Sequence, residues 1–151
     1  MNAMKNVKSL LLGTVLTVAS MNGFAEESFP MVMVYKTPTC GCCTEWSNHL
    51  EANGFKVMNH NVEDMNKYKE KANLPYGLGS CHTAFVGGYA VEGHVPASDI
   101  KRMLTEKPAI RGLAVPGMPM GSPGMEYGDR KDAYNTISYT KDGKTSVYAS
   151  H

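Results

Sequence analysis

Short apolar runs alternate with polar segments in the first half of the chain. Residues 29–37 and 55–62 are rich in β-branched and aromatic side chains, and their length favours strands over helices. Between them, Trp46 and Leu50 follow Cys43 at helical spacing, and a glycine closes the segment. We therefore expect strand, helix, strand, with Trp46 in the core of the protein.

A second helix and two hairpins follow along the chain. Residues 63–74 predict a polar helix that ends before a proline. Two strand-like runs, 82–86 and 89–95, flank a Gly-Gly pair typical of a tight turn, and residues 96–108 predict a helix that begins beside Pro96. Residues 135–150 predict a second hairpin, which turns at an Asp-Gly pair.

Residues 114–126, called the Met-rich loop below, combine Pro, Gly and Met without periodicity, which predicts a loop. The order of elements before it is β-α-β-α-β-β-α, which is the order of the thioredoxin and glutaredoxin fold. We therefore expect one α/β domain over residues 26–151. It would contain a mixed four-stranded sheet whose last pair is antiparallel, flanking helices, the Met-rich loop and a C-terminal β-hairpin.

The first 25 residues have the pattern of an export signal. A lysine-containing start precedes an apolar core, residues 9–21, that is too short to span a bilayer. Gly23 and Ala25 are small residues at the positions that precede a cleavage site. We expect cleavage after Ala25 and no membrane insertion of the mature chain.

The balance of charged residues argues against some classes of function. Removing the export signal takes two lysines from the 15 Lys and Arg, so basic residues nearly balance the 14 Asp and Glu. This balance argues against a nucleic-acid partner or a basic membrane-binding face. Export also carries the four cysteines into an oxidising compartment, where free thiols need protection.

Three of the cysteines, Cys40, Cys42 and Cys43, lie within four positions. Cys40 and Cys43 have Cys-x-x-Cys spacing between a strand and a helix, where the helix N-terminus stabilises thiolate over thiol. Two features depart from a dithiol catalyst: the additional thiol of Cys42, and Cys81 directly before the third strand, where a thioredoxin-like fold carries a cis-proline. We expect Cys81 to face the other three cysteines.

Four converging thiolates suit a soft metal. Cu(I) favours thiolate and thioether ligands, and a thiolate can bridge two Cu(I) ions, so the pattern allows a multinuclear copper site. Zinc ranks second, because structural zinc sites usually use two separated Cys-x-x-Cys pairs and the chain has one.

Other residues near the cluster are candidate ligands. Met118, Met120 and Met125 either bind Cu(I) or pack the Met-rich loop onto the core. His82 adjoins Cys81 and is a further candidate, with a structural role as the alternative. The remaining histidines of the central part of the chain are interpreted as surface residues: His49, His60 and His94.

Two other interpretations remain open. In a thiol–disulfide oxidoreductase, Cys40 would be the exposed nucleophile and Cys43 the resolving thiol, and the other two cysteines would be dispensable. In a disulfide-stapled module, the pairs would be 40–43 with 42–81, or 40–42 with 43–81, because adjacent cysteines are strained as a pair.

The joint pattern of residues 35–43, 80–84, 92–97 and 112–126 resembles the CopG-type proteins, a family of bacterial periplasmic proteins associated with copper resistance. The resemblance implies a thioredoxin-like fold, a periplasmic location and cysteines that bind copper and take part in its redox chemistry. The resemblance also implies that Cys40, Cys42, Cys43 and Cys81 are copper ligands, and that the three methionines of the Met-rich loop are candidates nearby. Copper ions, and other periplasmic copper-handling or efflux proteins, are the partners it implies.

Overall fold

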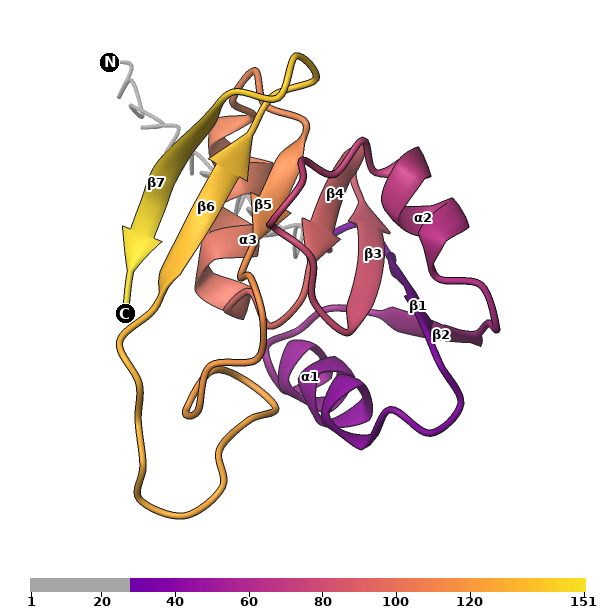
Figure 1. Cartoon of the computed structure of the whole chain (residues 1–151), viewed down its shortest axis with the longest axis vertical. Helices are drawn as coiled ribbons and strands as arrows, with labels where there is room; N and C mark the ends of the chain where they lie inside the picture. The colour runs from indigo at the N-terminus through magenta and orange to yellow at the C-terminus, as the bar shows by residue number, and fades with distance from the viewer. Residues whose placement is uncertain (1–27) are drawn as a thin grey trace, which may run out of the picture.

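The computed structural model describes residues 28–151, so the predicted export signal lies outside the described part of the chain. Seven strands form one mixed sheet in the order β2-β1-β3-β4-β5-β6-β7, with three helices beside it (Figure 1). Its elements are β1 (Val32–Lys36), α1 (Gly41–Ala52), β2 (Val57–Asn61), α2 (Asn66–Lys71), β3 (His82–Val86), β4 (Tyr89–Glu92), α3 (Ala97–Glu106), β5 (Gly112–Ala114), β6 (Asn135–Tyr139) and β7 (Thr145–Ser150). Within residues 28–151, none of the helices has the length and apolar character needed to cross a membrane.

The first four strands agree with the expected arrangement. β1 pairs with β2 in parallel and with β3 antiparallel, and β3 and β4 form the antiparallel hairpin predicted from the Gly-Gly turn. Side chains of β1 alternate between buried and half-buried, as a strand with both faces covered requires.

The predicted strand count of four is wrong, because the sheet continues through a strand that the sequence analysis did not identify. β5 pairs in parallel with β4 and antiparallel with β6, so the C-terminal hairpin extends the same sheet. With only three residues, β5 is too short to show an alternating pattern. Its last residue, Ala114, was assigned to the Met-rich loop and is fully buried in the strand.

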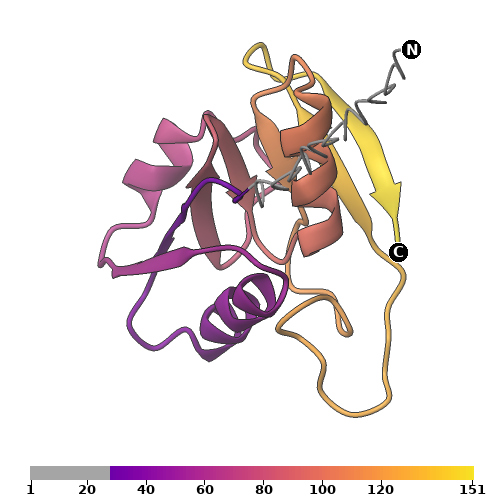
Figure 2. The same cartoon turned by 180° about the vertical axis from the view of Figure 1, so that it is seen from behind.

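The helices cover both faces of the sheet. α1 and α3 lie over the same face, which Figure 2 shows from behind. This face carries the larger core, and Trp46 in it is fully buried, which confirms its predicted core position. A smaller cluster around Ala72 and Tyr139 lies on the other face, beside α2.

The helices are placed as predicted but have different ends. α1 begins at Gly41, before the predicted stripe of Cys43, Trp46 and Leu50, so Cys42 and Cys43 belong to its first turn. α2 has only six residues: the carboxylate of Asp64 accepts the N–H of Asn66 in a turn before the helix, and Asn73 adopts a left-handed conformation (φ +52°) just after it. α3 ends where Lys107 adopts a left-handed conformation (φ +49°).

Candidate metal centre

The N-terminus of α1 presents three cysteines. Cys40 is the N-cap residue and has an extended backbone, while Cys42 and Cys43 follow in the first turn. Cys40 and Cys43 are joined by a disulfide, and Cys42 is a free thiol. Cys43 is fully buried, whereas Cys40 is partly exposed, so Cys40 is the sulfur of the pair that solvent can reach.

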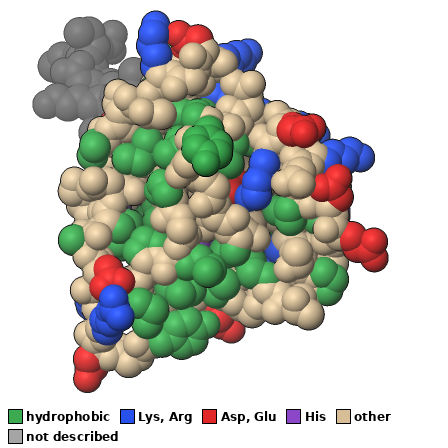
Figure 3. Space-filling model, in the orientation of Figure 1, with side chains coloured by type: hydrophobic (Ala, Val, Ile, Leu, Met, Phe, Trp, Pro, Cys, Tyr) green, Lys and Arg blue, Asp and Glu red, His purple; other side chains and the backbone are tan. Residues whose placement is uncertain are grey.

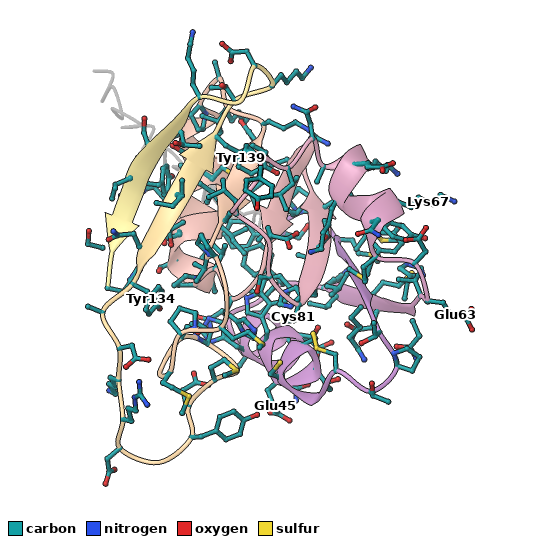
Figure 4. All side chains as sticks on the ribbon, in the orientation of Figure 1. Glu45, Glu63, Lys67, Cys81, Tyr134 and Tyr139 are labelled. Carbon is teal, nitrogen blue, oxygen red and sulfur yellow. A yellow bond between two sulfur atoms is a disulfide. The ribbon has the colours of Figure 1, made fainter. Side chains whose placement is uncertain are left out.

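Cys81 reaches this cluster from the loop before β3. In the antiparallel register of β1 and β3, Lys36 lies opposite His82, so the chain leaves β1 towards Cys40 at the edge where Cys81 enters β3. The Sγ atom of Cys42 is 3.8 Å from that of Cys81 and 3.7 Å from that of Cys40. The structure thus brings together the four cysteines named from the sequence, with their sulfur atoms within 4.8 Å of one another. Figure 4 shows Cys81 beside α1, where further sulfur atoms gather.

The prediction that His94 is a surface residue is wrong. Its side chain is fully buried, and Nε2 lies 3.1 Å from the Sγ of Cys81. The other ring nitrogen, Nδ1, is 2.8 Å from the carbonyl oxygen of Pro123 and donates to it. A neutral imidazole with its proton on Nδ1 carries a lone pair on Nε2, so this lone pair faces the cysteine sulfur.

The hairpin register contains a signal that would have located His94. Thr83 pairs with Glu92 across the β3–β4 hairpin. Counting two residues outward on each strand places Cys81 opposite His94. The Gly-Gly turn was predicted, and the same register continued two residues beyond the pair of Thr83 and Glu92 locates His94.

His82 also contacts the cluster. Its Nδ1 is 3.5 Å from the Sγ of Cys81, and its ring packs on Trp46 with 4.3 Å between the centroids. The ring is fully buried, and Nε2 has no hydrogen-bond partner among the described residues. Burial lowers the pKa of His82 well below its usual value, and it also lowers the pKa of His94. Both rings are therefore neutral at pH 7, as metal binding requires.

The free thiol of Cys81 is protonated in the metal-free protein. Burial, followed by the nearby thiol of Cys42, raises the pKa of Cys81 to about 12. A metal bound at this sulfur would displace the proton, so binding and proton release are coupled.

The Met-rich loop packs against α1. A Cβ atom on Gly124 would lie 2.7 Å from the carbonyl oxygen of Cys42 and 2.7 Å from the backbone nitrogen of Trp46, so only a glycine fits there. Met118 is 52% exposed, and Met120 and Met125 are half-buried. The loop is thus docked beside the cluster, and the role of its methionines as ligands stays a prediction.

The other two histidines interpreted as surface residues, His49 and His60, lie outside the cluster, although neither is fully exposed. His49 is half-buried, and its Nε2 accepts the N–H of Ala97 at the start of α3 (3.1 Å). His60 is half-buried and stacks on Tyr35, with 4.9 Å between the ring centroids. Their interpretation as surface residues is therefore only partly right.

The outer surface around the cluster is apolar. In Figure 3, hydrophobic side chains gather over the lower part of the face, where Figure 1 shows α1 and the loop after β5, and charged side chains lie mainly at the rim. Large apolar side chains exposed on the two loops beside the cluster are Tyr76, Met118 and Tyr127.

The donor atoms fit a metal ion. Around a tetrahedral ion with metal–sulfur bonds of about 2.3 Å, neighbouring sulfurs are separated by about 3.8 Å. The separations of Cys42 from Cys40 and Cys81 match this value. A second donor group shares Cys81 and adds the nitrogens of His82 and His94. Once the disulfide between Cys40 and Cys43 is reduced, the arrangement offers a sulfur-only set and a sulfur–nitrogen set that meet at Cys81.

Comparisons with known proteins point to the same part of the chain as the candidate metal centre. A family model described as "Protein of unknown function, DUF411" matches residues 78–125, which include Cys81, both buried histidines and all but the last residue of the Met-rich loop. Two solved structures, titled "Copper resistance protein copG- Form 1" and "Copper resistance protein copG- Form 2", are each 50% identical to this chain with a TM-score of 0.77. They cover 82% and 81% of this chain, and 98% of each solved chain is matched. No curated protein matches the chain.

Proposed function

Since this chain belongs to the CopG family of copper resistance proteins, we propose that it binds Cu(I) through its cysteines and contributes to copper resistance. The observation that carries the proposal is the convergence of Cys40, Cys42, Cys43 and Cys81, with sulfur atoms within 4.8 Å of one another. Thiolates are the ligands that Cu(I) favours, and shared thiolates allow more than one ion in the site.

Copper binding by all four sulfurs requires reduction of the disulfide between Cys40 and Cys43. Two electrons and two protons convert the disulfide to two thiols, and bound metal then displaces the protons. The helix N-terminus favours this step, because its free N–H groups stabilise negative charge on Cys40. The reduced protein is thus the form that would hold copper on four thiolates.

We extend the proposed ligand set to the two buried imidazoles. His94 is held by the carbonyl oxygen of Pro123 with its Nε2 lone pair towards Cys81, which is the usual outer hydrogen bond of a metal-binding histidine. His82 offers Nδ1 at the same sulfur. Met118, Met120 and Met125 of the docked loop are proposed as thioether ligands or as a route for copper to the cluster.

Zinc is the second candidate metal, because four cysteines also form tetrahedral zinc sites. The mixed donor set and the methionines of the neighbouring loop favour copper.

We further propose that residues 28–106 form a thioredoxin-like unit to which the C-terminal strands are added. The strand order β2-β1-β3-β4 supports this assignment, as does the placement of α1 and α3 on one face with α2 on the other. A periplasmic location, after cleavage at Ala25, remains our proposal from the sequence of the first 25 residues and the family. Copper ions, and other periplasmic copper-handling or efflux proteins, are the proposed partners.

The second candidate function is a thiol–disulfide oxidoreductase. The disulfide between Cys40 and Cys43 at the start of α1 favours it, because Cys40 is accessible and Cys43 is buried. The reduced Cys40 thiolate would attack a substrate disulfide, and Cys43 would then release the reduced substrate and re-form the disulfide. A dithiol reductant would have to supply two electrons per turnover.

A titration separates the two functions. The reduced protein is titrated anaerobically with Cu(I) against a competing chelator, and copper per chain is measured. A variant without the four cysteines is the control, because any copper that it retains must lie on methionine or histidine. Tight binding that the control loses supports copper handling. No binding above the chelator, with catalysed disulfide reduction by the same sample, would establish the oxidoreductase instead.

A further inference from the structure

A buried ion pair lies beneath the loop that carries Cys81. Glu92 on β4 is fully buried, and its Oε1 forms an ion pair with Nζ of Lys69 on α2, whose side chain is 24% exposed. Burial raises the pKa of Glu92, and the charge of Lys69 opposes this increase. A buried charge carries a large desolvation cost, which is offset only where the geometry and the surrounding hydrogen bonds are good.

The hydrogen bonds of this pair converge on the residue before Cys81. The N–H of Ser80 donates to Oε1 of Glu92 (2.7 Å), and Nζ of Lys69 donates to the carbonyl oxygen of Ser80 (2.9 Å). Both backbone polar groups of Ser80 are therefore bound to one ion pair. The hydroxyl of Thr83 donates to the other carboxylate oxygen of Glu92 (2.6 Å). This hydrogen bond links the carboxylate to β3, two residues after Cys81.

Ser80 is enclosed from its other side by backbone. A Cβ atom on Gly93 (φ +70°) would lie 2.6 Å from the Cβ of Ser80 and 2.6 Å from the carbonyl oxygen of Val115. The hydroxyl of Ser80 donates to the carbonyl oxygen of Gly117. The position of Ser80 is thus fixed by β4, α2 and the segment that follows β5.

The surroundings of Cys81 indicate why an ion pair holds the loop before β3. Cys81 lies outside regular structure, directly before β3, and α2 buries none of its six residues against the described chain. Apolar packing near this loop comes from partly buried side chains: Tyr68 of α2 stacks on Tyr35 (3.9 Å between ring centroids), and Leu74 and Leu78 pack on the cluster around Ala72 and Tyr139. The ion pair adds directional hydrogen bonds at Ser80, the residue next to the sulfur that both donor groups share.

We infer that Lys69 and Glu92 are positioning residues, which hold Cys81 opposite Cys42 and so set the geometry of the metal centre. Only the measurement of copper affinity rests on the proposed function; the positioning of Cys81 can be tested without it. Groups that orient metal ligands typically contribute 10- to 100-fold to metal affinity.

The test uses Lys69→Met, which keeps an unbranched side chain and removes both hydrogen bonds. We expect the Cu(I) affinity of the reduced protein to fall by about 10- to 100-fold. Lys69→Arg retains a donor for both oxygens and should restore most of the affinity. Lys144→Met is the matched control, because it removes an exposed ion pair with Asp142 that forms no hydrogen bond to Ser80 or Cys81, and it should leave copper binding unchanged.

A second readout needs no metal. In a Cys40→Ser/Cys43→Ser background, a short bifunctional thiol reagent should bridge Cys42 and Cys81, whose sulfurs are 3.8 Å apart. Lys69→Met should lower the rate of bridging relative to the rate of single alkylation. A lysine that only stabilises the fold would change the melting temperature without changing this ratio.

The double variant Lys69→Met/Glu92→Gln leaves no unpaired buried charge, so it keeps the test valid if Lys69→Met does not fold. Unchanged bridging and unchanged copper affinity in a folded variant would overturn the inference. If the unsubstituted protein binds no Cu(I) but Lys69→Met still lowers the bridging ratio, the proposed function fails and the positioning role stands.

Discussion

Gly124 fixes the Met-rich loop to α1, and its replacement by alanine tests how firmly the loop is docked. The added Cβ would lie 2.7 Å from two backbone atoms of α1, in Cys42 and Trp46, neither of which can rotate away. The backbone at Gly124 also has φ +85°, a left-handed conformation that disfavours alanine by about 1–2 kcal/mol. Steric overlap in a packed region adds about 1–3 kcal/mol. We therefore expect Gly124→Ala to lower the free energy of unfolding by about 2–5 kcal/mol.

Gly128→Ala is the matched control for this prediction. Gly128 has a similar backbone conformation (φ +66°), and a Cβ there would meet no described atom within 4 Å. It should incur only the backbone cost of about 1–2 kcal/mol. Urea unfolding of both metal-free variants measures the difference, which is the contribution of the contact between loop and helix. Equal destabilisation by the two substitutions would refute the docked loop.

Three further predictions concern the site itself. His94→Gln should weaken Cu(I) binding by about tenfold, because it removes the nitrogen that faces Cys81, whereas His49→Gln should not; equal affinities would exclude His94 as a ligand. The apparent Cu(I) affinity should increase as pH rises from about 6 to 8. The reason is that the thiol of Cys81, whose pKa is about 12, must lose its proton when the metal binds. A pH-independent affinity in chelator competition would contradict thiolate ligation. Alkylation and mass spectrometry of the air-oxidised, denatured protein should modify the two free thiols, Cys42 and Cys81, and reduction should raise the number to four; any other labelled pair would contradict the disulfide assignment.

The elements with strong local patterns were predictable from the sequence. Trp46 and Leu50 mark the buried stripe of α1, and the Gly-Gly turn identifies the β3–β4 hairpin. The parallel pairing of β1 and β2 agrees with the expected element order. The signals for α1 and for the hairpin each lie within about a dozen residues, where periodicity and turn chemistry decide the structure.

The features that were missed depend on pairing between distant segments. β5 is a strand because β4 and β6 lie on either side of it, and its three residues carry no pattern of their own. His94 is buried because the Met-rich loop folds over it and Pro123 accepts its Nδ1 proton. By contrast, the convergence of Cys81 on the other cysteines was predicted, because the expected fold places the residue before the third strand beside the Cys-x-x-Cys pair. The ion pair of Lys69 and Glu92 beneath it has no local sequence signal.

The central claim is that four cysteines share one copper site, and Cys42 tests it most directly. Cys42 lies outside the disulfide and within 3.8 Å of the sulfurs of Cys40 and Cys81, and an oxidoreductase would not need it. Copper per chain should be measured in reduced Cys42→Ser and in the unsubstituted protein, anaerobically and against the same chelator. We predict that the unsubstituted protein holds more than one tightly bound copper and that Cys42→Ser loses part of it. Normal copper binding by Cys42→Ser would contradict the shared thiolate site.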